Sequence, residues 1–395
     1  MKRVLFYTTF LTQGGGIEVA AIRYVNEFVK RGYIVDLYID YDFGKENIRE
    51  KEVNKKIKIK YLRSEKLSKF IYKLRTLGKS NKFYNIFLYL FVILSDYFIW
   101  KRIIKDSKDK QYDLVITFFQ FQSSYITKIK ARSHLIFLHG SVTRFFTGLR
   151  KYFKRLFFKK LNKFDYICTV SQEMGKELLR IAPELKSKQR TVYNPIDFNI
   201  IEEKGNEIEE LSEKEKNIIK EKYLCSVGRL DEVDKDFTNL IIGYKELLEE
   251  ENIKENLVII GDGPNKRELE NLVLRLKMEK RVIFLGRKQN PYIWIKNSEA
   301  FILSSKSEGF GIVLIEALVL NKKVVSSDCP VGPREILNNG KYGELFEVGN
   351  TKEMKKKIMK VLNPNYILLE NKSYLKNKFT DGIVKIEEII NDKNK

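Results

Sequence analysis

The chain has 395 residues, 43% of them hydrophobic, and this length is too great for one ordinary core, so two folded domains are expected. Its three cysteines, Cys168, Cys225 and Cys329, form no Cys-x-x-Cys pair, which argues against a disulfide framework or a structural zinc site and suits a reducing compartment. Because His134 and His139 are the only histidines, a multi-histidine metal centre is excluded.

The net charge of +22 is unevenly placed along the chain. Residues 1–200 contain 40 Lys and Arg against 18 Asp and Glu, whereas residues 201–395 contain 34 of each kind. The whole excess therefore lies in the first half. A one-sided basic field of this kind attracts nucleic acid, anionic lipid or a polyanionic substrate.

The N-terminal residues predict a strand, a glycine turn, a helix and a second strand. Val4–Thr8 is β-rich and too short for the apolar core of a signal peptide. Gly14, Gly15 and Gly16 precede a helical pattern over 17–31, and a strand follows over 33–39. Rossmann-like folds bind phosphate or sugar groups at this turn, although a tight turn alone also explains the glycines.

Residues 83–100 form the most apolar stretch, interrupted by Asp96. Because a membrane-spanning helix needs about 20 predominantly apolar residues, we expect a buried or membrane-facing helix here rather than a span.

Further strands are predicted over 57–62, 113–119 and 134–138. His139 directly follows the last of them, where α/β sheets place ligand-binding groups, and a structural histidine at a strand end is the alternative.

Residues 144–164 alternate aromatic and cationic side chains at roughly helical spacing. One face of such a helix would contain Phe153, Leu156, Phe157, Leu161 and Phe164. This pattern suits the surface of an anionic bilayer. It equally suits an ordinary surface helix whose apolar side packs on the sheet.

After a strand over 165–169, Ser171 is the expected N-cap of a helix over 172–181. A strand and turn follow over 192–197. Residues 202–222 are almost entirely Glu, Lys and Asn with scattered Ile and Leu, which indicates an exposed hinge or a helical insert.

The second half again alternates strands and helices. Strands are predicted over 223–227, 257–260, 282–285, 300–304, 323–326 and 342–346, and helices over 238–249, 265–277, 292–296, 312–320, 351–362 and 379–391. Gly228, Arg229 and Lys235 follow the first strand, where the two cations are either ligand groups or solvated charges. Two α/β halves with glycine loops at strand ends imply a ligand in the cleft between them.

Glu308–Glu316 joins the strand over 300–304 to the next helix. Gly309 and Gly311 allow a ligand to approach the backbone, and the amides at a helix start favour an anion. Glu308 and Glu316 bracket the turn; carboxylates on a solvated face are the plain alternative.

These motifs, taken in order, resemble the retaining, nucleotide-sugar-dependent glycosyltransferases of family 4. The matching residues are Gly14-Gly15-Gly16-Ile17-Glu18, His139, Val170-Ser171, Asn194-Pro195-Ile196-Asp197, Ser226-Val227-Gly228-Arg229-Leu230, Lys235, Gly261-Asp262-Gly263-Pro264, and Glu308 with Glu316 as the family's Glu-x7-Glu element. The resemblance implies the GT-B fold, an α/β architecture of two facing Rossmann-like domains with a cleft between them.

The implied domains are a basic acceptor-binding domain over 1–200, a linker or insert over 201–222, a nucleotide-sugar domain over 223–365, and a helical tail over 366–395 that packs back on the first domain.

The resemblance also implies a role for each matching residue. Arg229 and Lys235 would bind the donor diphosphate, whose charge grows in the transition state. Glu316 would hold the ribose hydroxyls. Glu308 would face the donor sugar, and His139 would contact it from the other domain. The remaining donor-binding residues would be Gly15, Gly16, Gly263, Arg287, Gly309, Phe310, Gly311 and Ile312, with the base near 261–264 and Arg287-Lys288.

The implied reaction is transfer of a hexose or N-acetylhexosamine from a nucleoside-diphosphate sugar, UDP-sugar by family frequency, to a lipid-linked or surface-polysaccharide acceptor. The family's architecture needs no cofactor and no metal. Asp40-Tyr-Asp42 and Asp234-Lys-Asp236 spell the Asp-x-Asp element of the other large glycosyltransferase fold, and we interpret both as surface coincidences. The charge distribution predicts a cytoplasmic enzyme held peripherally on the cytoplasmic face of the inner membrane.

Three other functions compete with this hypothesis. If 308–316 were all helix, the two glutamates would lie roughly 12 Å apart at 1.5 Å per residue, beyond the ~5–9.5 Å of a glycosidase carboxylate pair. A GT-B sugar-nucleotide epimerase would turn over the donor without an acceptor. A non-catalytic binder of nucleic acid or another polyanion would explain the charge, but the sequence shows no recognised nucleic-acid motif, so we expect no nucleic-acid partner.

Overall fold

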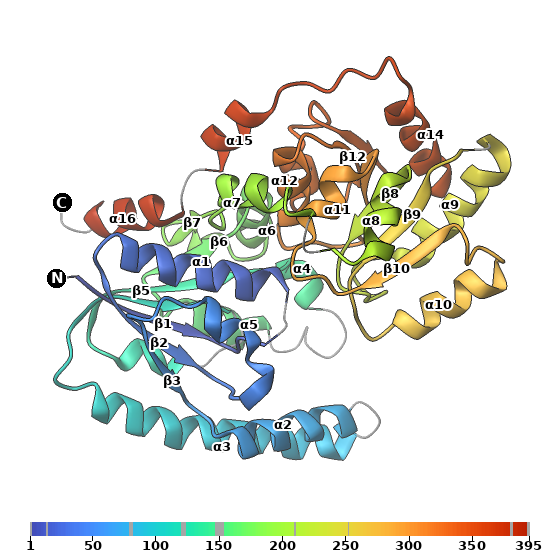
Figure 1. Ribbon diagram of the computed structural model, residues 1–395. Helices are drawn as coiled ribbons and strands as arrows, with labels where there is room; N and C mark the ends of the chain where they lie inside the picture. The colour runs from blue at the N-terminus through green and yellow to red at the C-terminus, as the bar shows by residue number, and fades with distance from the viewer. Residues whose placement is uncertain are drawn as a thin grey trace. The chain divides into compact units, whose positions relative to one another are not determined.

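The computed structural model describes residues 2–12, 15–78, 82–119, 124–146, 154–208, 211–251, 253–379 and 382–392. The chain divides into two compact units. Unit 1 comprises Met1–Pro195 and Thr380–Lys395, and unit 2 comprises Ile196–Phe379. Each unit has one sheet with helices packed around it (Figure 1).

The sheet of unit 1 has seven strands in the order β3-β2-β1-β4-β5-β6-β7, and every pairing between them is parallel. The strands are β1 (Arg3–Thr8), β2 (Ile34–Ile39), β3 (Lys58–Tyr61), β4 (Tyr112–Thr117), β5 (Ala131–Leu138), β6 (Tyr166–Thr169) and β7 (Gln189–Thr191). The central strands read as apolar runs because helices cover both faces of a parallel sheet. The predicted strands are confirmed except at 192–197, where the last strand ends at Thr191.

The α-helices of unit 1 are α1 (Gly16–Lys30), α2 (Glu65–Gly78), α3 (Lys82–Asp106), α4 (Val142–Phe145), α5 (Lys154–Leu161), α6 (Gln172–Ile181) and α16 (Gly382–Asp392). Short 3-10 helices are η1 (Gly44–Glu46), η2 (Ile48–Glu52), η3 (Ser124–Lys128) and η5 (Pro183–Leu185). The cap predicted at Ser171 is confirmed, because its hydroxyl accepts a hydrogen bond from the Met174 amide at 3.1 Å.

The C-terminal helix α16 belongs to unit 1, where it packs against α1. Glu387 accepts hydrogen bonds from Arg31 at 3.1 Å and from the Tyr33 hydroxyl at 2.8 Å. A side chain at Gly382 would collide with the hydroxyl of Tyr24, so the helix start requires glycine for this close approach.

Helices α2 and α3 form an antiparallel pair along the lower edge of Figure 1. Arg63 holds α3 to the sheet by pairing with both Asp40, after β2, and Asp96, in α3. Asp40 is therefore buried and structural, so the predicted surface position is wrong for the first Asp-x-Asp sequence. Removal from water is the main reason that the pKa of Asp40 is raised to about 6.

The helix predicted over 144–164 is wrong as one continuous helix. The described part contains α4 and α5, and Phe153 lies outside the described residues. In α5, Phe158 and Leu161 are buried while Leu156 is 63% exposed, so the expected apolar face is wrong at Leu156. Phe157 and Phe158 pack against Phe146, with ring centroids 5.3 and 5.6 Å away. The apolar side of α5 is thus used for packing.

The sheet of unit 2 has six parallel strands in the order β10-β9-β8-β11-β12-β13. They are β8 (Tyr223–Val227), β9 (Asn256–Ile260), β10 (Val282–Gly286), β11 (Ala300–Leu303), β12 (Lys323–Ser327) and β13 (Glu344–Phe346). The helices are α7 (Phe198–Lys204), α8 (Glu213–Lys220), α9 (Phe237–Glu251), α10 (Lys266–Arg275), α11 (Tyr292–Asn297), α12 (Ile312–Val319), α13 (Pro333–Ile336), α14 (Thr351–Leu362) and α15 (Lys372–Lys378).

The segment expected to be a hinge or an insert is helical. Helix α7 packs on α11 and α12, and α8 packs on α11. Ser212 and Glu215 form a capping box that fixes the start of α8. These residues therefore belong to unit 2 rather than to an exposed hinge.

Both sheets share the strand order of doubly wound folds, in which the chain runs outward from the first strand and then crosses to the other side. The crossing point lies between β1 and β4 in unit 1 and between β8 and β11 in unit 2. Ligands of such sheets bind beyond the carboxyl ends of the strands at this switch point. We therefore expect a ligand site of unit 2 at the loops after β8 and β11.

Among the helices of the described residues, none combines the length and the apolar character that crossing a bilayer requires.

Candidate functional site

The loops after β8 and β11 are joined by an ion pair at the switch point of unit 2. The Lys235 ammonium lies 2.5 Å from Oε1 of Glu308, and the Ser305 hydroxyl donates to the same oxygen at 2.6 Å. Only 9% of the Glu308 side chain and 20% of the Lys235 side chain are exposed. Two residues separated by 73 positions in the sequence are thus held together.

A second set of contacts fixes the same two loops. Lys306 pairs with Asp236 at 2.8 Å, and the Ser304 hydroxyl donates to the Lys235 carbonyl at 2.9 Å. Asp236 is buried and has a left-handed backbone with φ of 55°, which is uncommon outside glycine. The predicted surface position is therefore wrong for the second Asp-x-Asp sequence as well, because Asp236 is a structural part of the loop.

Arg229 is the other predicted phosphate-binding cation. Its side chain is 69% exposed and lies 3.9 Å from Asp231, a contact that is weak in water. Arg229 therefore has most of its side chain exposed to solvent, just after the end of β8.

The loop before α12 depends on two glycines. Gly311, the N-cap of α12, has φ of 87°, and Gly332 lies so close to Phe310 that an added Cβ would meet the Phe310 carbonyl at 1.9 Å. Phe310 is buried and its ring lies edge-on to Phe379 at 5.4 Å, so it anchors the loop by packing. Gly309 and Ile312 complete the turn. Among the described residues no side chain caps α12, which leaves its first-turn amides directed at the space beyond β11.

Glu316 lies one turn into α12 and is half-buried. The Tyr292 hydroxyl, from α11, donates to its Oε1 at 3.1 Å. This contact orients the carboxylate of Glu316. Tyr292 was missed by sequence reasoning, because the link between α11 and α12 exists only in the folded unit.

In the predicted base-binding region, packing between two loops gives Gly263 a structural explanation. A Cβ at Gly263 would meet the Leu230 backbone at 2.3 Å, so close packing of two loops already explains this glycine. The neighbouring Lys288 pairs with Glu215 of α8 at 2.5 Å, and this partner is the main reason that the pKa of Glu215 is lowered to about 2. Arg287 follows directly after β10.

In unit 1, His139 directly follows β5 and is 7% exposed. Its ring packs against Phe118 and Phe137, with centroids 4.4 and 5.9 Å away. Burial lowers the pKa of His139 to about 3. The imidazole is therefore neutral near pH 7, which suits hydrogen bonding to a sugar hydroxyl rather than attraction of a phosphate.

Glu177, in α6, holds the segment that follows His139. Its carboxylate accepts hydrogen bonds from the Ser141 hydroxyl at 2.6 Å, from the Val142 amide at 2.8 Å and from the Thr143 amide at 3.2 Å. A carboxylate at a helix start is stabilised by the helix dipole. Sequence reasoning missed this residue, because its partners lie more than 30 positions away.

Gly15 and Gly16 lie at the start of α1, and both are exposed. An added Cβ at Gly15 would meet no atom within 4 Å, so packing does not require glycine there. Gly14, which belongs to the same turn, lies outside the described residues.

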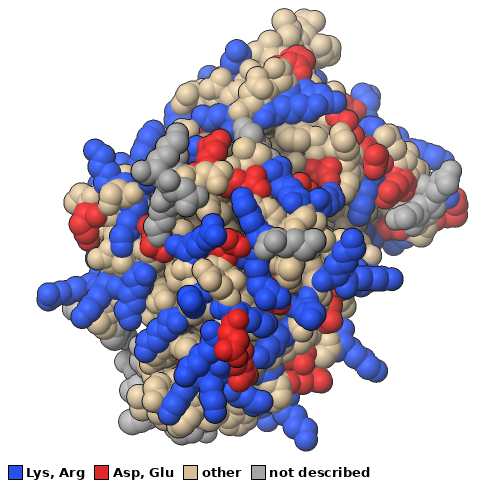
Figure 2. Space-filling view, turned by 90° about the vertical axis from the view of Figure 1, so that its left-hand side faces the viewer, with Lys and Arg blue, Asp and Glu red and all other residues tan. Residues whose placement is uncertain are grey.

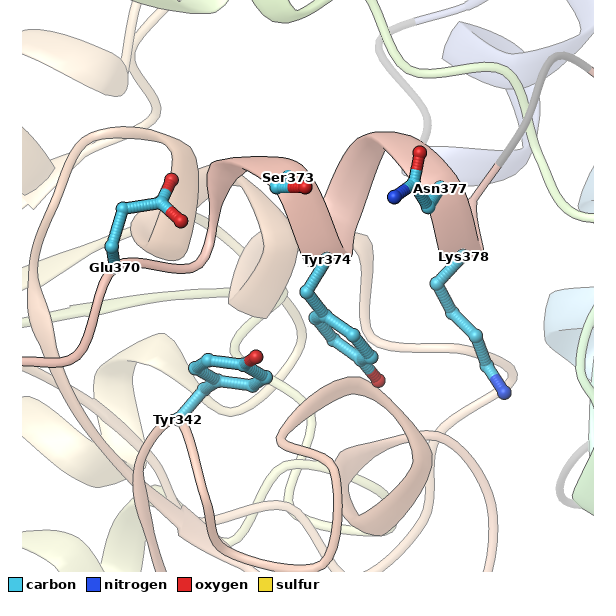
Figure 3. A pocket seen from close by; sticks show the side chains of 6 residues that line it. All are labelled: Tyr342, Glu370, Ser373, Tyr374, Asn377 and Lys378. Atoms are coloured by element: carbon cyan, nitrogen blue, oxygen red, sulfur yellow. The ribbon is translucent and has the colours of Figure 1, made fainter.

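A surface hollow of about 440 Å³ lies elsewhere in unit 2 (Figure 3). It is lined by Tyr342, Glu370, Ser373, Tyr374, Asn377 and Lys378, with the two tyrosine rings stacked at 4.6 Å. These side chains come from α15, from the segment before it and from the loop before β13, so the hollow contains none of the predicted site residues. Within the described residues, no group of three or more His, Cys, Asp or Glu is arranged to hold a metal ion.

Comparison with known families covers nearly the whole chain. The family described as "Glycosyltransferase Family 4" matches residues 14–199, and the family described as "Glycosyl transferases group 1" matches residues 207–378. The chain belongs to the family 4 glycosyltransferases. The two matches meet close to the boundary between unit 1 and unit 2.

Two relatives illustrate how far the similarity of this glycosyltransferase chain extends. An uncharacterized glycosyltransferase of Methanocaldococcus jannaschii is 37% identical over 44% of this chain and 42% of its own length. The N-acetylgalactosamine-N,N'-diacetylbacillosaminyl-diphospho-undecaprenol 4-alpha-N-acetylgalactosaminyltransferase of Campylobacter jejuni is 34% identical over 51% of this chain and 54% of its own length. The chain thus matches about half the length of each relative.

The solved structure of Anabaena HepE in complex with UDP and glucose resembles the whole glycosyltransferase chain. The TM-score is 0.75 at 16% identity, over 99% of this chain and all of that one. With the two parallel sheets, this likeness confirms the predicted GT-B fold.

Proposed function

We propose that this glycosyltransferase transfers a hexose or N-acetylhexosamine, with retention of configuration, from a nucleoside-diphosphate sugar to a lipid-linked or surface-polysaccharide acceptor. The observation that carries the proposal is the Lys235–Glu308 pair at the switch point of unit 2, with Arg229 exposed in the same loop after β8 as Lys235. A fixed cation can bind a diphosphate, and a fixed carboxylate can accept hydrogen bonds from sugar hydroxyls. The pair therefore suits a ligand in which a diphosphate is joined to a sugar.

Each of these groups has a role in binding the donor. Arg229, Lys235 and the first-turn amides of α12 stabilise the diphosphate, whose negative charge grows as it leaves. Glu308 accepts hydrogen bonds from hydroxyls of the donor sugar. Glu316, oriented by Tyr292, accepts hydrogen bonds from the ribose hydroxyls. Within unit 1, the neutral His139 suits a hydrogen bond to a sugar hydroxyl, and Gly15 and Gly16 offer backbone amides that suit a phosphate.

The reaction proceeds on one face of the sugar. The acceptor hydroxyl oxygen forms a bond to the anomeric carbon as the bond from that carbon to the phosphate oxygen breaks. The nucleoside diphosphate leaves, and its phosphate oxygen takes the acceptor proton. The protein supplies position and charge, so the proposed reaction requires no metal.

UDP-sugar is the donor that we propose, and the acceptor is lipid-linked. The support for the donor is the likeness of the fold to a protein solved with UDP and glucose. The support for the acceptor is the Campylobacter relative, whose name includes a diphospho-undecaprenol-linked sugar. With the basic first half of the chain, this acceptor favours a peripheral position at the cytoplasmic face of a membrane.

A panel of nucleotide sugars tests the proposal. Slow hydrolysis of one donor without acceptor, and faster turnover with a lipid-linked glycan in the presence of a metal chelator, are expected. The glycosidic bond formed should keep the anomeric configuration of the donor by NMR. Conversion of the donor into an epimer, or inversion at the anomeric carbon, would contradict the proposal.

A further inference from the structure

Helix α3 exposes an apolar stripe on its outer side. Leu90, Ile93, Leu94, Tyr97 and Phe98 recur at intervals of three and four residues, and their exposed fractions are 56, 42, 59, 44 and 66%. This spacing places all five on one face of the helix. Surfaces of soluble proteins carry scattered apolar residues, but a contiguous patch marks a contact with a partner or a membrane.

The opposite side of α3 already has its partners. Asp96 pairs with the buried Arg63, the ring of Trp100 lies edge-on to Tyr7 at 5.0 Å, and Ile103 is buried. The fold therefore packs this face of the helix and leaves the apolar stripe exposed, with Tyr97 also lying edge-on to Tyr125 at 6.2 Å.

Helix α2 extends the same apolar surface. Phe70 is 46% exposed and its ring lies 5.9 Å from that of Phe91, in α3. We call the α3 stripe together with Phe70 the hairpin surface. It combines aromatic and branched side chains from two helices that pack side by side (Figure 1).

Cations surround the hairpin surface. Exposed basic side chains on the two helices are Lys66, Lys69, Lys73, Lys101, Arg102 and Lys105, against exposed Glu65 and Asp106. Figure 2 shows Lys and Arg spread over the lower part of the face, at the height of α2 and α3 in Figure 1, with fewer Asp and Glu among them. An apolar surface bordered by cations complements an anionic bilayer, because the two groups meet acyl chains and phosphate headgroups respectively.

We propose that the hairpin surface docks this glycosyltransferase on a bilayer containing anionic phospholipid. Leu90, Leu94 and Phe98 enter the boundary between headgroups and acyl chains, and Lys101 and Lys105 contact phosphates. Tyr97 occupies the interface, where its ring is apolar and its hydroxyl remains hydrated. Helix α5 is the weaker candidate, since Phe157 and Phe158 pack within unit 1 and burial lowers the pKa of Lys160 to about 8.

This inference deepens the proposed function, on which it rests for the lipid-linked acceptor. Docking through α2 and α3 would keep the acceptor-binding unit at the membrane surface without a spanning helix. Its test needs neither donor nor acceptor, so a failure of docking is distinguishable from a failure of catalysis.

The experiment is flotation of the full chain with vesicles containing phosphatidylglycerol and, separately, with vesicles of phosphatidylcholine alone. The double variant Leu94→Glu/Phe98→Glu removes two apolar contacts at exposed positions and adds repulsion. We expect it to lower the partition coefficient on the anionic vesicles by at least about tenfold. Ile367→Glu is the matched control, because Ile367 is 78% exposed in unit 2 and lies outside the hairpin surface.

The charge component has its own variant, Lys101→Gln/Lys105→Gln, which should weaken binding about tenfold and reduce its dependence on salt. The melting temperature and the far-UV circular dichroism spectrum should be the same in all variants, which shows that each one folds. Wild-type protein that does not float, or a double variant that floats as well as wild type, would overturn the proposal. So would a wild-type dimer in sedimentation that Leu94→Glu/Phe98→Glu separates, if neither protein binds vesicles.

Discussion

The two units share one strand order but place different chemistry at their switch points. In unit 2, the loops after β8 and β11 present Arg229, Lys235 and Glu308, and ion pairs interlock these loops. In unit 1, the described residues near the same point present the backbone of Gly15 and Gly16 and the neutral ring of His139. The two sheets thus bring loops together at equivalent points, while the loop residues decide which chemical groups each unit presents there.

The net charge of the two halves of the chain differs in the opposite sense from the charge at the two switch points. Residues 1–200 carry the whole net positive charge, whereas residues 201–395 are neutral overall. Unit 2 thus has charged candidate residues at its switch point although its half of the chain is neutral overall. Unit 1 instead carries an excess of cations spread along its sequence. The first arrangement suits a small charged donor, and the second suits an extended anionic surface.

Loss of the Lys235 ammonium should produce the largest effect. Lys235→Met keeps much of the apolar stem but removes the charge beside the leaving diphosphate, so kcat/KM should fall by about 100- to 1,000-fold. Steady-state kinetics with the donor identified in the panel measure it. Lys360→Met is the control, because Lys360 pairs with Glu344 at 2.6 Å and has no place in the proposed site.

Glu308→Gln removes the negative charge of the Glu308 side chain while keeping its size and shape. We expect kcat to fall by about 100-fold with a smaller change in KM, because the carboxylate positions the sugar for reaction. Combined with Lys235→Met, the loss should be less than the product of the two single losses, since the residues act as one pair. Strict multiplication of the two losses would indicate that the pair does not act together.

Glu316→Ala should weaken UDP binding by about tenfold, since a hydrogen bond to a charged group contributes about 1.5–3 kcal/mol. Tyr292→Phe removes only the hydroxyl that orients Glu316 and should weaken binding by about threefold. Calorimetric titration measures both. If Tyr292→Phe has the larger effect, the hydroxyl contacts the ligand itself rather than acting through Glu316.

His139 should affect the pH dependence of stability more than the pH dependence of turnover. Its folded pKa of about 3 lies below the ordinary value of 6.5, so the unfolded chain takes up a proton that the folded chain refuses. Stability therefore falls as the pH decreases from about 6.5, by about 1.5 kcal/mol at pH 5. His139→Phe should remove this part of the slope in denaturant titrations. A difference between the two proteins that does not change with pH would contradict the assignment.

Most strands and helices were predictable because apolar spacing and glycine turns are local signals. Helix α14 was predicted over the residues it occupies, and β8 likewise. Helix α2 was missed, because lysines interrupt its pattern and its apolar face is completed by α3. The outer face of α3 was also unpredictable, since a helix with apolar residues all round does not reveal which side packs inward.

Residues of the candidate site could be proposed from the sequence where the motif is contiguous and not where a contact depends on packing. Gly311 and Glu316 belong to one short stretch, whose spacing identified them. The contacts of Tyr292 with Glu316 and of Glu177 with the segment after His139 join elements distant in sequence, so no local pattern announces them. Asp40 and Asp236 were misplaced for the same reason, because each is buried by a cation from another element.

The central claim is that the loops after β8 and β11 hold the donor diphosphate. Calorimetric titration of UDP, with GDP in parallel, into wild type, Lys235→Met and Lys360→Met tests it most directly. We predict that affinity for the bound nucleotide falls at least about tenfold in Lys235→Met, which leaves Glu308 to repel the diphosphate, and stays unchanged in Lys360→Met. Equal affinity in all three proteins would contradict the claim.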